Sequence, residues 1–289
     1  MSVSADRTHA LLHVLADGRF HSGEVVAQSL GVTRAAVWKK VRAMEKLGLT
    51  VFRVPGRGYR LAEPLELLDA ARIREALPAA CREKLGGLTV LDQVDSTNSW
   101  LSRNPGEPAV CLAEFQSAGR GRRGRGWVSP FGANLYMSLA WRFDEWPPGF
   151  TALGMVTAIA AVRALKGLGL PDVSIKWPND LMAAGKKLGG VLVDIEGEPP
   201  LATRAVIGLG VNVRMPAAAA SDIDQPWMDL ATLAQGTPPE RNRLAAALIR
   251  ALVEALEDFA HTGFAGFSAD WQALDLVAGR AVALHAQDR

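Results

Sequence analysis

The spacing of the apolar residues changes along this chain, and the change divides it into two units. Through residue 63 they recur at helical intervals, as in Leu11, Leu12 and Leu15. From Gly87 onward they gather in short β-rich runs, with helical patterns between and after them. A chain of 289 residues is long enough for two domains, since domains usually hold ~100–200 residues. We therefore expect an α+β protein with a small domain at residues 1–63 and a larger one at residues 64–272.

The first unit has the pattern of a winged helix–turn–helix. Ser22 and Thr33 are each placed to cap a helix. The buried face of the second helix is predicted by its apolar residues, which are Val37, Val41, Met44 and Leu47. Two short β-rich runs joined by a Pro-Gly-Arg-Gly turn follow within residues 51–61. This hairpin is the expected wing, so the unit has the form of a DNA-binding domain.

Positive charge is concentrated in this first unit. Residues 34–60 hold eight Arg or Lys residues and one acid, a net +7 (8 − 1), whereas the whole chain carries +2. Such segregation is typical of a surface that contacts nucleic-acid phosphates. The expected DNA-contacting residues are Arg34, Trp38, Lys39, Arg42 and Arg57. The alternative is a winged-helix module whose basic helix is merely solvated and which binds another protein.

The second unit alternates strand and helix patterns. Strands are predicted at 88–94, 109–115, 135–143, 173–176, 188–195 and 205–213. Helices are predicted at 67–77, 97–102, 150–168 and 240–261. The alanine run at 217–220 is expected to be a surface loop. This order of elements favours a domain built on a mixed sheet.

The most informative segment is Gly119–Trp127, here called the arginine loop. It contains four glycines and four arginines. Glycines let backbone amides approach a ligand closely, and guanidinium groups match carboxylates and phosphates in shape and charge. A loop of this kind can fold over a bound anion. RNA-binding tails have a similar composition, but they lie in disordered sequence, whereas this loop lies between two predicted strands.

Two further segments place polar groups beside predicted strands. Asn179 and Asp180 follow a short strand and can bind a ligand or hold Mg²⁺ by one or two oxygens; a plain Pro-Asn-Asp turn is the alternative. Lys187 leads into a strand that begins with glycines, and strand glycines often mark a place where a ligand approaches the backbone. Gly208 and Gly210 repeat this pattern, without the spacing of a dinucleotide-binding fingerprint.

Cysteine usage and hydropathy limit the cellular setting. The two cysteines, Cys81 and Cys111, lie in apolar or helical stretches, which argues against a disulfide framework and fits a reducing cytoplasm. We expect no signal peptide at the N-terminus. We also expect no membrane span and no membrane partner, because no apolar run approaches ~18 residues and the richest, 152–165, contains Arg163.

Several motifs, taken together and in order, resemble those of one family. They are Asp95–Asn98, Gln116, the arginine loop, Ser129–Tyr136, Lys176–Leu181 and Lys187–Val193. Over most of its length the chain resembles the bifunctional biotin–protein ligase/biotin operon repressor family, in its helix–turn–helix-bearing class. The resemblance implies that ATP and biotin form biotinyl-5′-AMP, and that a lysine of the biotin carboxyl carrier protein of acetyl-CoA carboxylase then takes the biotinyl group. It also implies that the adenylate is a corepressor for a homodimer on operator DNA.

The resemblance implies roles for individual residues. Those that would hold the biotin ureido ring and nearby atoms are Ser96, Thr97, Asn98 and Gln116. Those that would contact biotin or its adenylate are Arg120, Gly121, Arg122 and Lys187, with Arg122 and Lys187 as the catalytic residues. The backbone would contact the biotin tail at Gly190, Gly208 and Gly210. ATP or the adenylate would also meet Asn179, Asp180, Asn212 and Trp227, with Asp180 as the magnesium ligand and Trp227 over adenine.

The chain departs from the family pattern at two places. Gly126 stands where relatives commonly have lysine, so we expect the arginine loop to hold phosphates less strongly. Relatives carry an SH3-like barrel after the central domain, and Asp275–Leu284 resembles its first strand. Residues 273–289 are therefore expected to be the remnant of a barrel that is largely missing. The alternative function is a transcription regulator that binds biotin but has lost efficient ligation; a lipoate–protein ligase, which shares the fold, is a further alternative.

Overall fold

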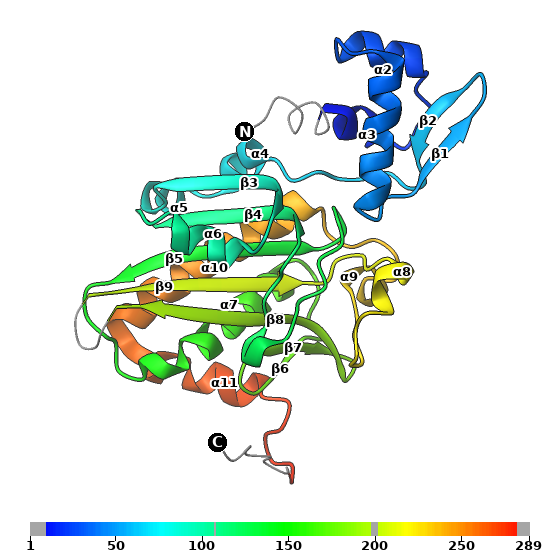
Figure 1. Ribbon diagram of the computed structural model, residues 1–289. Coiled ribbons are helices and arrows are strands. Elements are labelled where there is room, and N and C mark those ends of the chain that lie inside the picture. Colours follow the sequence, from blue (N-terminus) through cyan, green and yellow to red (C-terminus); the bar gives the residue numbers. More distant parts are fainter. Residues whose placement is uncertain (1–9, 107, 198–201, 282–289) are drawn as a thin grey trace.

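Figure 1 shows two units, a small one of helices and a hairpin beside a larger one built on a sheet. The structure, a computed structural model, describes residues 10–106, 108–197 and 202–281. The two units are joined by a linker that is extended after the hairpin and then continues into two short helices before the first strand of the sheet. This arrangement agrees with the α+β class predicted from the sequence.

The small unit is the predicted winged helix–turn–helix. It contains a helix at residues 10–15, α2 (Gly23–Ser29), α3 (Arg34–Lys46), β1 (Val51–Val54) and β2 (Gly58–Leu61). Both predicted caps are confirmed: the Val25 amide donates to Ser22 Oγ at 3.1 Å, and the Ala36 amide donates to Thr33 Oγ1 at 3.2 Å. The apolar face of α3 is fully buried at Val37, Val41 and Met44, and half-buried at Leu47.

The linker ends in two short helices, where the sequence predicted one. They are α4 (Ala70–Ala76) and α5 (Ala79–Lys84). Asp69 begins α4, because its carboxylate accepts from the Ala71 and Arg72 amides at 2.8 and 3.0 Å. Pro78 separates the two helices, since proline has no amide hydrogen for the helical ladder. The predicted helix at 67–77 is therefore shorter and starts later than expected.

The large unit is built on a seven-stranded mixed sheet in the order β3-β4-β5-β9-β8-β7-β6. Its strands are β3 (Gly87–Val94), β4 (Ala109–Gln116), β5 (Leu135–Phe143), β6 (Ser174–Lys176), β7 (Asp180–Ala183), β8 (Lys186–Glu196) and β9 (Thr203–Val211). Only β3 and β4 are parallel within the described sheet, and α6 (Thr97–Arg103) connects them. All six predicted strands are confirmed within a few residues. The sequence missed β7, which forms a tight hairpin with β8 through Ala184 and Gly185, both at positive φ.

Helices cover the two faces of the sheet unequally. On one face, α7 (Leu153–Gly167) and α10 (Arg241–Thr262) complete the main hydrophobic core. On the other, Leu101 of α6 packs against Cys111 in a small separate cluster. Successive residues of β4 alternate between them, as the period of a strand requires: Val110 and Leu112 belong to the main core, and Cys111 to the small cluster.

The segment Phe150–Gly167 is long and apolar enough to cross a membrane, with a mean hydropathy of 1.3. The sequence analysis expected no segment of that length. However, 67% of it is buried inside the protein, and α7, which forms most of it, packs on α10 and the sheet. This is the position of a core helix of the second domain.

Two local predictions are wrong. Ala217–Ala220 forms a short helix, α8, where a loop was expected, because the Ala219 and Ala220 amides donate to Pro216 O. The predicted strand at 275–284 is not formed over its described part. After α11 (Ser268–Leu274), Asp275 makes a single bridge to Ile175, and residues 276–279 then turn, with the Asp275 carboxylate accepting from the Val277 amide. Residues 282–284 lie outside the described residues.

Candidate active site and DNA-binding surface

The large unit contains a cavity of about 840 Å³ against the sheet, beneath the arginine loop. The predicted site residues that line it are Ser96, Thr97, Asn98, Gln116, Arg120, Gly121, Arg122, Asn179, Asp180, Lys187, Gly190, Gly208 and Gly210. The other two, Asn212 and Trp227, line an adjoining pocket of about 60 Å³, which shares Trp127 and Lys187 with the cavity. Residues up to 131 positions apart in the chain (227 − 96) are thus brought to one place.

One end of the cavity is formed by uncharged polar groups at the start of α6. The Ser96 side chain caps this helix, and Ser96, Thr97 and Asn98 are all buried. The Thr97 amide donates to Gln116 Oε1 at 2.9 Å, and Gln116 Nε2 donates to Ser129 Oγ at 3.1 Å. This end of the cavity offers hydrogen-bond donors and acceptors but no free charge, which suits a small uncharged polar ring.

Ser138 on strand β5 contacts two residues of α6, Thr97 and Asn98, through its hydroxyl group. Its hydroxyl lies 2.7 Å from Thr97 Oγ1 and 2.6 Å from Asn98 Oδ1. Ser138 is fully buried. Because buried polar groups with satisfied hydrogen bonds hold fixed positions, this contact preorganises the polar end of the cavity.

A network of three side chains connects the polar end to the arginine loop. Asn98 Nδ2 donates to Asp194 Oδ2 at 3.0 Å, and the Arg120 guanidinium donates to the two oxygens of the same carboxylate at 3.1 and 3.5 Å. The carboxylate of Asp194 therefore offsets the charge of Arg120 in this state. Arg122 is held differently, since it donates to the neutral amide oxygen of Asn179 at 3.3 Å and keeps its full charge at the cavity.

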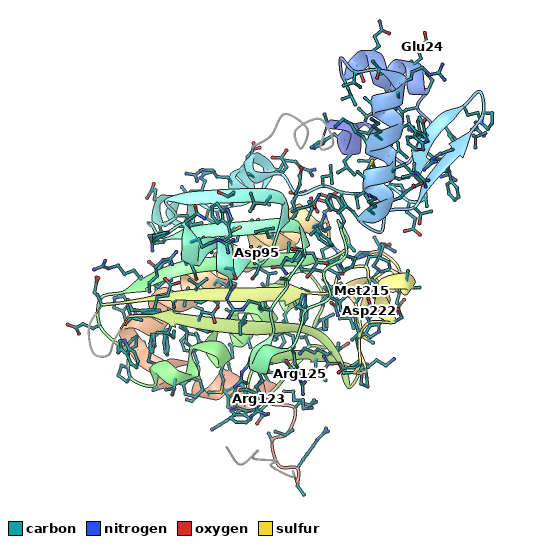
Figure 2. The ribbon with its side chains drawn as sticks, in the orientation of Figure 1. Glu24, Asp95, Arg123, Arg125, Met215 and Asp222 are labelled. Atoms are coloured by element: carbon teal, nitrogen blue, oxygen red, sulfur yellow. The ribbon has the colours of Figure 1, made fainter. Side chains whose placement is uncertain are left out.

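The arginine loop is folded into a compact turn. The Gly121 amide donates to Arg125 O at 2.8 Å, and the Trp127 amide donates to Gly119 O at 2.9 Å. The 3₁₀ turn η1 (Arg122–Gly124) lies at its tip, with Arg123 in the left-handed region at φ 57°. Figure 2 shows Arg123 and Arg125 on the arginine loop, far from Glu24 on the winged helix.

Lys187 lies at the junction of the cavity and the small pocket. Its Nζ is 2.8 Å from Asp180 Oδ1 and 5.6 Å from the centre of the Trp127 ring. Lys187 is the second residue of β8 and forms a backbone bridge with Trp227. Asn212 Nδ2 donates to Met228 O, next to Trp227, at 3.0 Å. The cation therefore stands between the polar end of the cavity and the pocket that contains the second tryptophan.

Packing inside the protein explains why two of the three strand glycines lack a side chain, and this was not predicted from the sequence. A Cβ at Gly210 would lie 2.6 Å from Cε2 of the Trp127 indole, and a Cβ at Gly208 would overlap Oδ1 of Asn98. These two glycines make room for protein side chains. Gly190 is different, because the nearest atom to a Cβ there is Cε of Lys187 at 3.4 Å. Contact of the three with a ligand stays a prediction.

All five predicted DNA-contacting residues lie exposed on the winged helix. Arg34, Lys39 and Arg42 are on α3, and Arg57 is in the turn of the wing. Arg57 stacks over Phe20, with its guanidinium carbon 4.2 Å from the ring centre. The fifth is Trp38, which is 46% exposed. The basic face that the sequence predicted is therefore present, and one of its cations, Arg42, pairs with Glu45 at 3.4 Å.

Three residues that shape the cavity have roles that were not predicted from the sequence. Trp127 ends the arginine loop, and its indole fills the space over Gly210. Asp194 and Ser138 were not considered, because each lies inside a strand pattern as an isolated polar residue. A buried polar residue between apolar strand neighbours was the available signal at Ser138, since such a residue needs a partner.

Known proteins resemble this chain in sequence over both units. Residues 90–212 match the biotin/lipoate A/B protein ligase family, and residues 7–60 match an HTH domain family. The chain is 43% identical over 282 residues to the bifunctional ligase/repressor BirA of Salmonella typhimurium, which covers 96% of this chain and 86% of that protein. The same protein of Escherichia coli is 42% identical over 282 residues, with 96% and 85% coverage.

A solved structure resembles about two thirds of the chain. The biotin protein ligase from Aquifex aeolicus in complex with biotin and ATP matches with a TM-score of 0.57 and 27% identity, covering 66% of this chain and 79% of that one. Fold and site together define a winged-helix protein that carries a biotin-type protein ligase domain. The chain belongs to the bifunctional ligase/repressor family of biotin–protein ligases.

Proposed function

We propose that this chain uses ATP to activate biotin as biotinyl-5′-AMP, transfers the biotinyl group to a lysine of a biotin carboxyl carrier protein, and represses transcription when the adenylate is bound. One observation carries the enzymatic part: a single cavity joins an uncharged polar end at Ser96–Asn98 to a cationic region at Arg122 and Lys187. A ligand with a neutral polar ring at one end and a carboxylate at the other matches this polarity.

The chemistry explains why the charges are needed. In the first step the biotin carboxylate attacks the α-phosphorus of ATP, an acyl–oxygen–phosphorus bond forms, and pyrophosphate leaves. Two anions must approach each other, so fixed positive charge in the cavity lowers the barrier. In the second step the carrier lysine amine attacks the acyl carbon, loses a proton and releases AMP.

Each end of the cavity has a part in this scheme. Ser96, Thr97, Asn98 and Gln116 hold the ureido ring with the donors and acceptors described above. Lys187 meets the biotin carboxylate or the α-phosphate, and Arg122 covers the phosphate from the arginine loop. The small pocket with Asn212 and Trp227 takes the adenine ring.

Magnesium fits this site through the nucleotide. Among the described residues no group of three or more His, Cys, Asp or Glu side chains lies together. Mg²⁺ in nucleotide sites is commonly bound by one or two carboxylates together with the phosphates, and Asp180 is a carboxylate on the cavity wall. We propose that Asp180 contributes an oxygen to magnesium, with Lys187 turning from it toward the phosphate.

The decisive experiment is to detect the adenylate. Purified chain is incubated with biotin, ATP and Mg²⁺, and biotinyl-5′-AMP and pyrophosphate are measured by mass spectrometry. A carrier domain is then added, and its biotinylated lysine is measured. Adenylate without transfer would support the regulator that has lost ligation, and no adenylate would refute the proposal. A thermal shift with biotin and none with lipoate is expected, because the polar end matches the ureido ring.

Dimerisation is proposed to use an open edge of the sheet. Within the described residues β8 pairs with β7 as far as Gly190, so Leu192–Glu196 pairs only with β9. Ile195 on this edge is 42% exposed. An unpaired edge is a template for a second strand, and a symmetric dimer would place two winged helices on two half-sites. Biotin plus ATP is expected to raise both the sedimentation coefficient and the affinity for a palindromic operator, and Ile195→Lys is expected to prevent both.

We propose a cytoplasmic location because the cysteine thiols are not joined in a disulfide. Cys81 and Cys111 are both free and buried. Free thiols fit a reducing compartment, which is also where ATP and a carboxylase carrier protein would be met. Localisation of a tagged full chain to the soluble cytoplasmic fraction is the expected result.

A further inference from the structure

Trp38 is an apolar side chain in a place where charged residues would be expected. It lies on α3, the second helix of the helix–turn–helix, and 46% of its surface is exposed. Its neighbours there are three cations and one acid. Together they line a shallow hollow of about 630 Å³, formed by Trp38, Lys39, Arg42, Glu45 and Lys46. A large aromatic side chain left in water within a functional face commonly marks a contact with a partner.

The indole is braced in one orientation. Arg42, one helical turn later, places its guanidinium carbon 5.4 Å from the centre of the Trp38 ring. Arg42 also donates to Glu45 at 3.4 Å, and Glu45 forms a close ion pair with Arg53 of the wing. The ring is therefore supported from the recognition helix and, through Glu45, from the wing. Because its position is set before binding, ordering it on a partner costs little entropy.

The residues around Trp38 indicate which kind of partner this face binds. Lys39, Arg42 and Lys46 attract an anionic surface, whereas the indole needs an apolar group between those anions. The major groove of DNA has this arrangement, with phosphates at its rims and the thymine C5-methyl group on its floor. The second helix of a helix–turn–helix lies in that groove. Resting on the operator binding proposed above, we propose that Trp38 reads the operator sequence by packing its indole against a thymine methyl, while the cations around it bind phosphates.

The test removes the methyl group and the indole separately. The probe is the palindromic duplex enriched from a randomised pool by the full chain loaded with biotin, ATP and Mg²⁺. Thymines are replaced by deoxyuridine one symmetric pair at a time, and affinities of the parent, Trp38→Ala and Trp38→Phe are measured by fluorescence anisotropy over a series of salt concentrations. Val25→Ala is the matched control, because Val25 is an apolar residue of the same unit that is 59% exposed on α2.

One deoxyuridine pair is expected to weaken binding by the parent about 3- to 10-fold. Trp38→Ala is expected to weaken binding to the thymine duplex about 5- to 30-fold, to lose all sensitivity to that pair, and to keep the salt slope of the parent. Trp38→Phe keeps part of the sensitivity, and Val25→Ala behaves as the parent. By contrast, Lys39→Ala is expected to lower the salt slope and to weaken all duplexes alike.

Two results would overturn the inference while operator binding stands: equal weakening of specific and random duplexes by Trp38→Ala, or equal sensitivity of parent and variant to every deoxyuridine pair. A parent that binds no duplex in the presence of biotin and ATP would refute the operator function and the inference together. Thermal unfolding of each variant shows that the winged helix is intact.

Discussion

The Trp127 indole occupies the space over the Cα of Gly210, so that a Cβ at residue 210 would lie 2.6 Å from indole Cε2. This contact fixes the position of the ring between the large cavity and the small pocket, since Trp127 lines both. Trp127 also lies under the Lys187 ammonium group. The absence of a side chain at Gly210 therefore sets the position of the Trp127 ring and of the Lys187 ammonium group above it.

Gly210→Ala is the first prediction. The added methyl must displace the indole, because the strand backbone of β9 is held on both sides by β5 and β8. We expect a loss of about 1–3 kcal/mol in the free energy of unfolding, the usual cost of overpacking, together with weaker biotin binding. Urea unfolding and isothermal titration calorimetry measure the two. Gly154→Ala in α7 is the control, since nothing lies within 4 Å of a Cβ there. Parent-like stability and affinity of Gly210→Ala would contradict the assignment.

Arg122→Gly is expected to release the adenylate early. Arg122 is the loop arginine that reaches across the cavity to Asn179, so its removal opens the loop and takes one charge from the phosphate. Free biotinyl-5′-AMP then acylates bystander lysines, and labelling of an added non-carrier protein rises. Arg123→Gly removes the same charge one residue away and relieves the positive φ of Arg123. Arg123→Gly is the matched control and is expected to label bystanders as the parent does. An Arg122→Gly protein that labels bystander lysines no more than the parent does would contradict the retaining role of Arg122.

A buried ion pair ties the interdomain linker to the catalytic domain. Arg241 and Glu114 are 4% and 1% exposed and lie 2.8 Å apart. Arg241 also donates to Asn134 O at 2.8 Å and to the linker carbonyl of Glu66 at 2.7 Å. The Glu66 carboxylate in turn accepts from Asn242 Nδ2 at 2.6 Å. The path from the winged helix to the sheet is therefore held by buried polar contacts with the large unit.

Replacing one member of this ion pair should lower the free energy of unfolding far more than replacing both. Arg241→Met leaves the Glu114 carboxylate buried without its cation, and such a loss costs about 3–5 kcal/mol of stability. In the double variant with Glu114→Gln the uncompensated charge is gone, so part of the stability returns. Urea unfolding of the parent, both single variants and the double variant gives the coupling energy. If the change in the free energy of unfolding of the double variant equals the sum of the two single changes, the ion pair does not act as a unit.

The parts of the fold that depend on local sequence were predictable, and those that depend on distant pairing were not. Ser22 and Thr33 cap helices with amides three residues away, so their roles can be inferred from a short segment. Arg120 and Asp194 meet across 74 positions, and Arg241 and Glu66 across 175. Such pairs arise only when the sheet is assembled. The motifs locate the candidate site, whereas the partners that hold each group in place are set by contacts that form only in the folded chain.

The predictions of the short elements were wrong for a related reason. Residues 180–183 form β7 only because β6 and β8 lie on either side of it; four residues carry too little periodicity to be identified alone. Asp275 was expected to begin a strand, but its carboxylate accepts from the Val277 amide and the chain turns at once. A local side-chain hydrogen bond here competes successfully with sheet pairing.

The last prediction concerns alkaline pH. Cys111 is fully buried on β4, and this burial raises the pKa of its thiol from 9.0 to about 12. A group whose pKa is higher in the folded state contributes its full stability below the unfolded pKa and loses it as pH rises toward the folded one. The free energy of unfolding of the parent, minus that of Cys111→Ala, should therefore be constant below pH 9. Between pH 9 and 12 it should fall by about 1.4 kcal/mol per pH unit, the value for one proton.

The difference between parent and variant isolates this thiol from other alkaline groups. Burial also raises the pKa values of Cys81 and Tyr136, but both residues are present in the parent and in Cys111→Ala, so their contributions cancel. A thiol reagent gives a second readout: at pH 8.5 Cys111 should react in urea but not in the native protein, because the thiolate is the reactive form. A stability difference that stays constant up to pH 11 would mean that the Cys111 thiol is open to water, and that the small cluster around Leu101 is not closed.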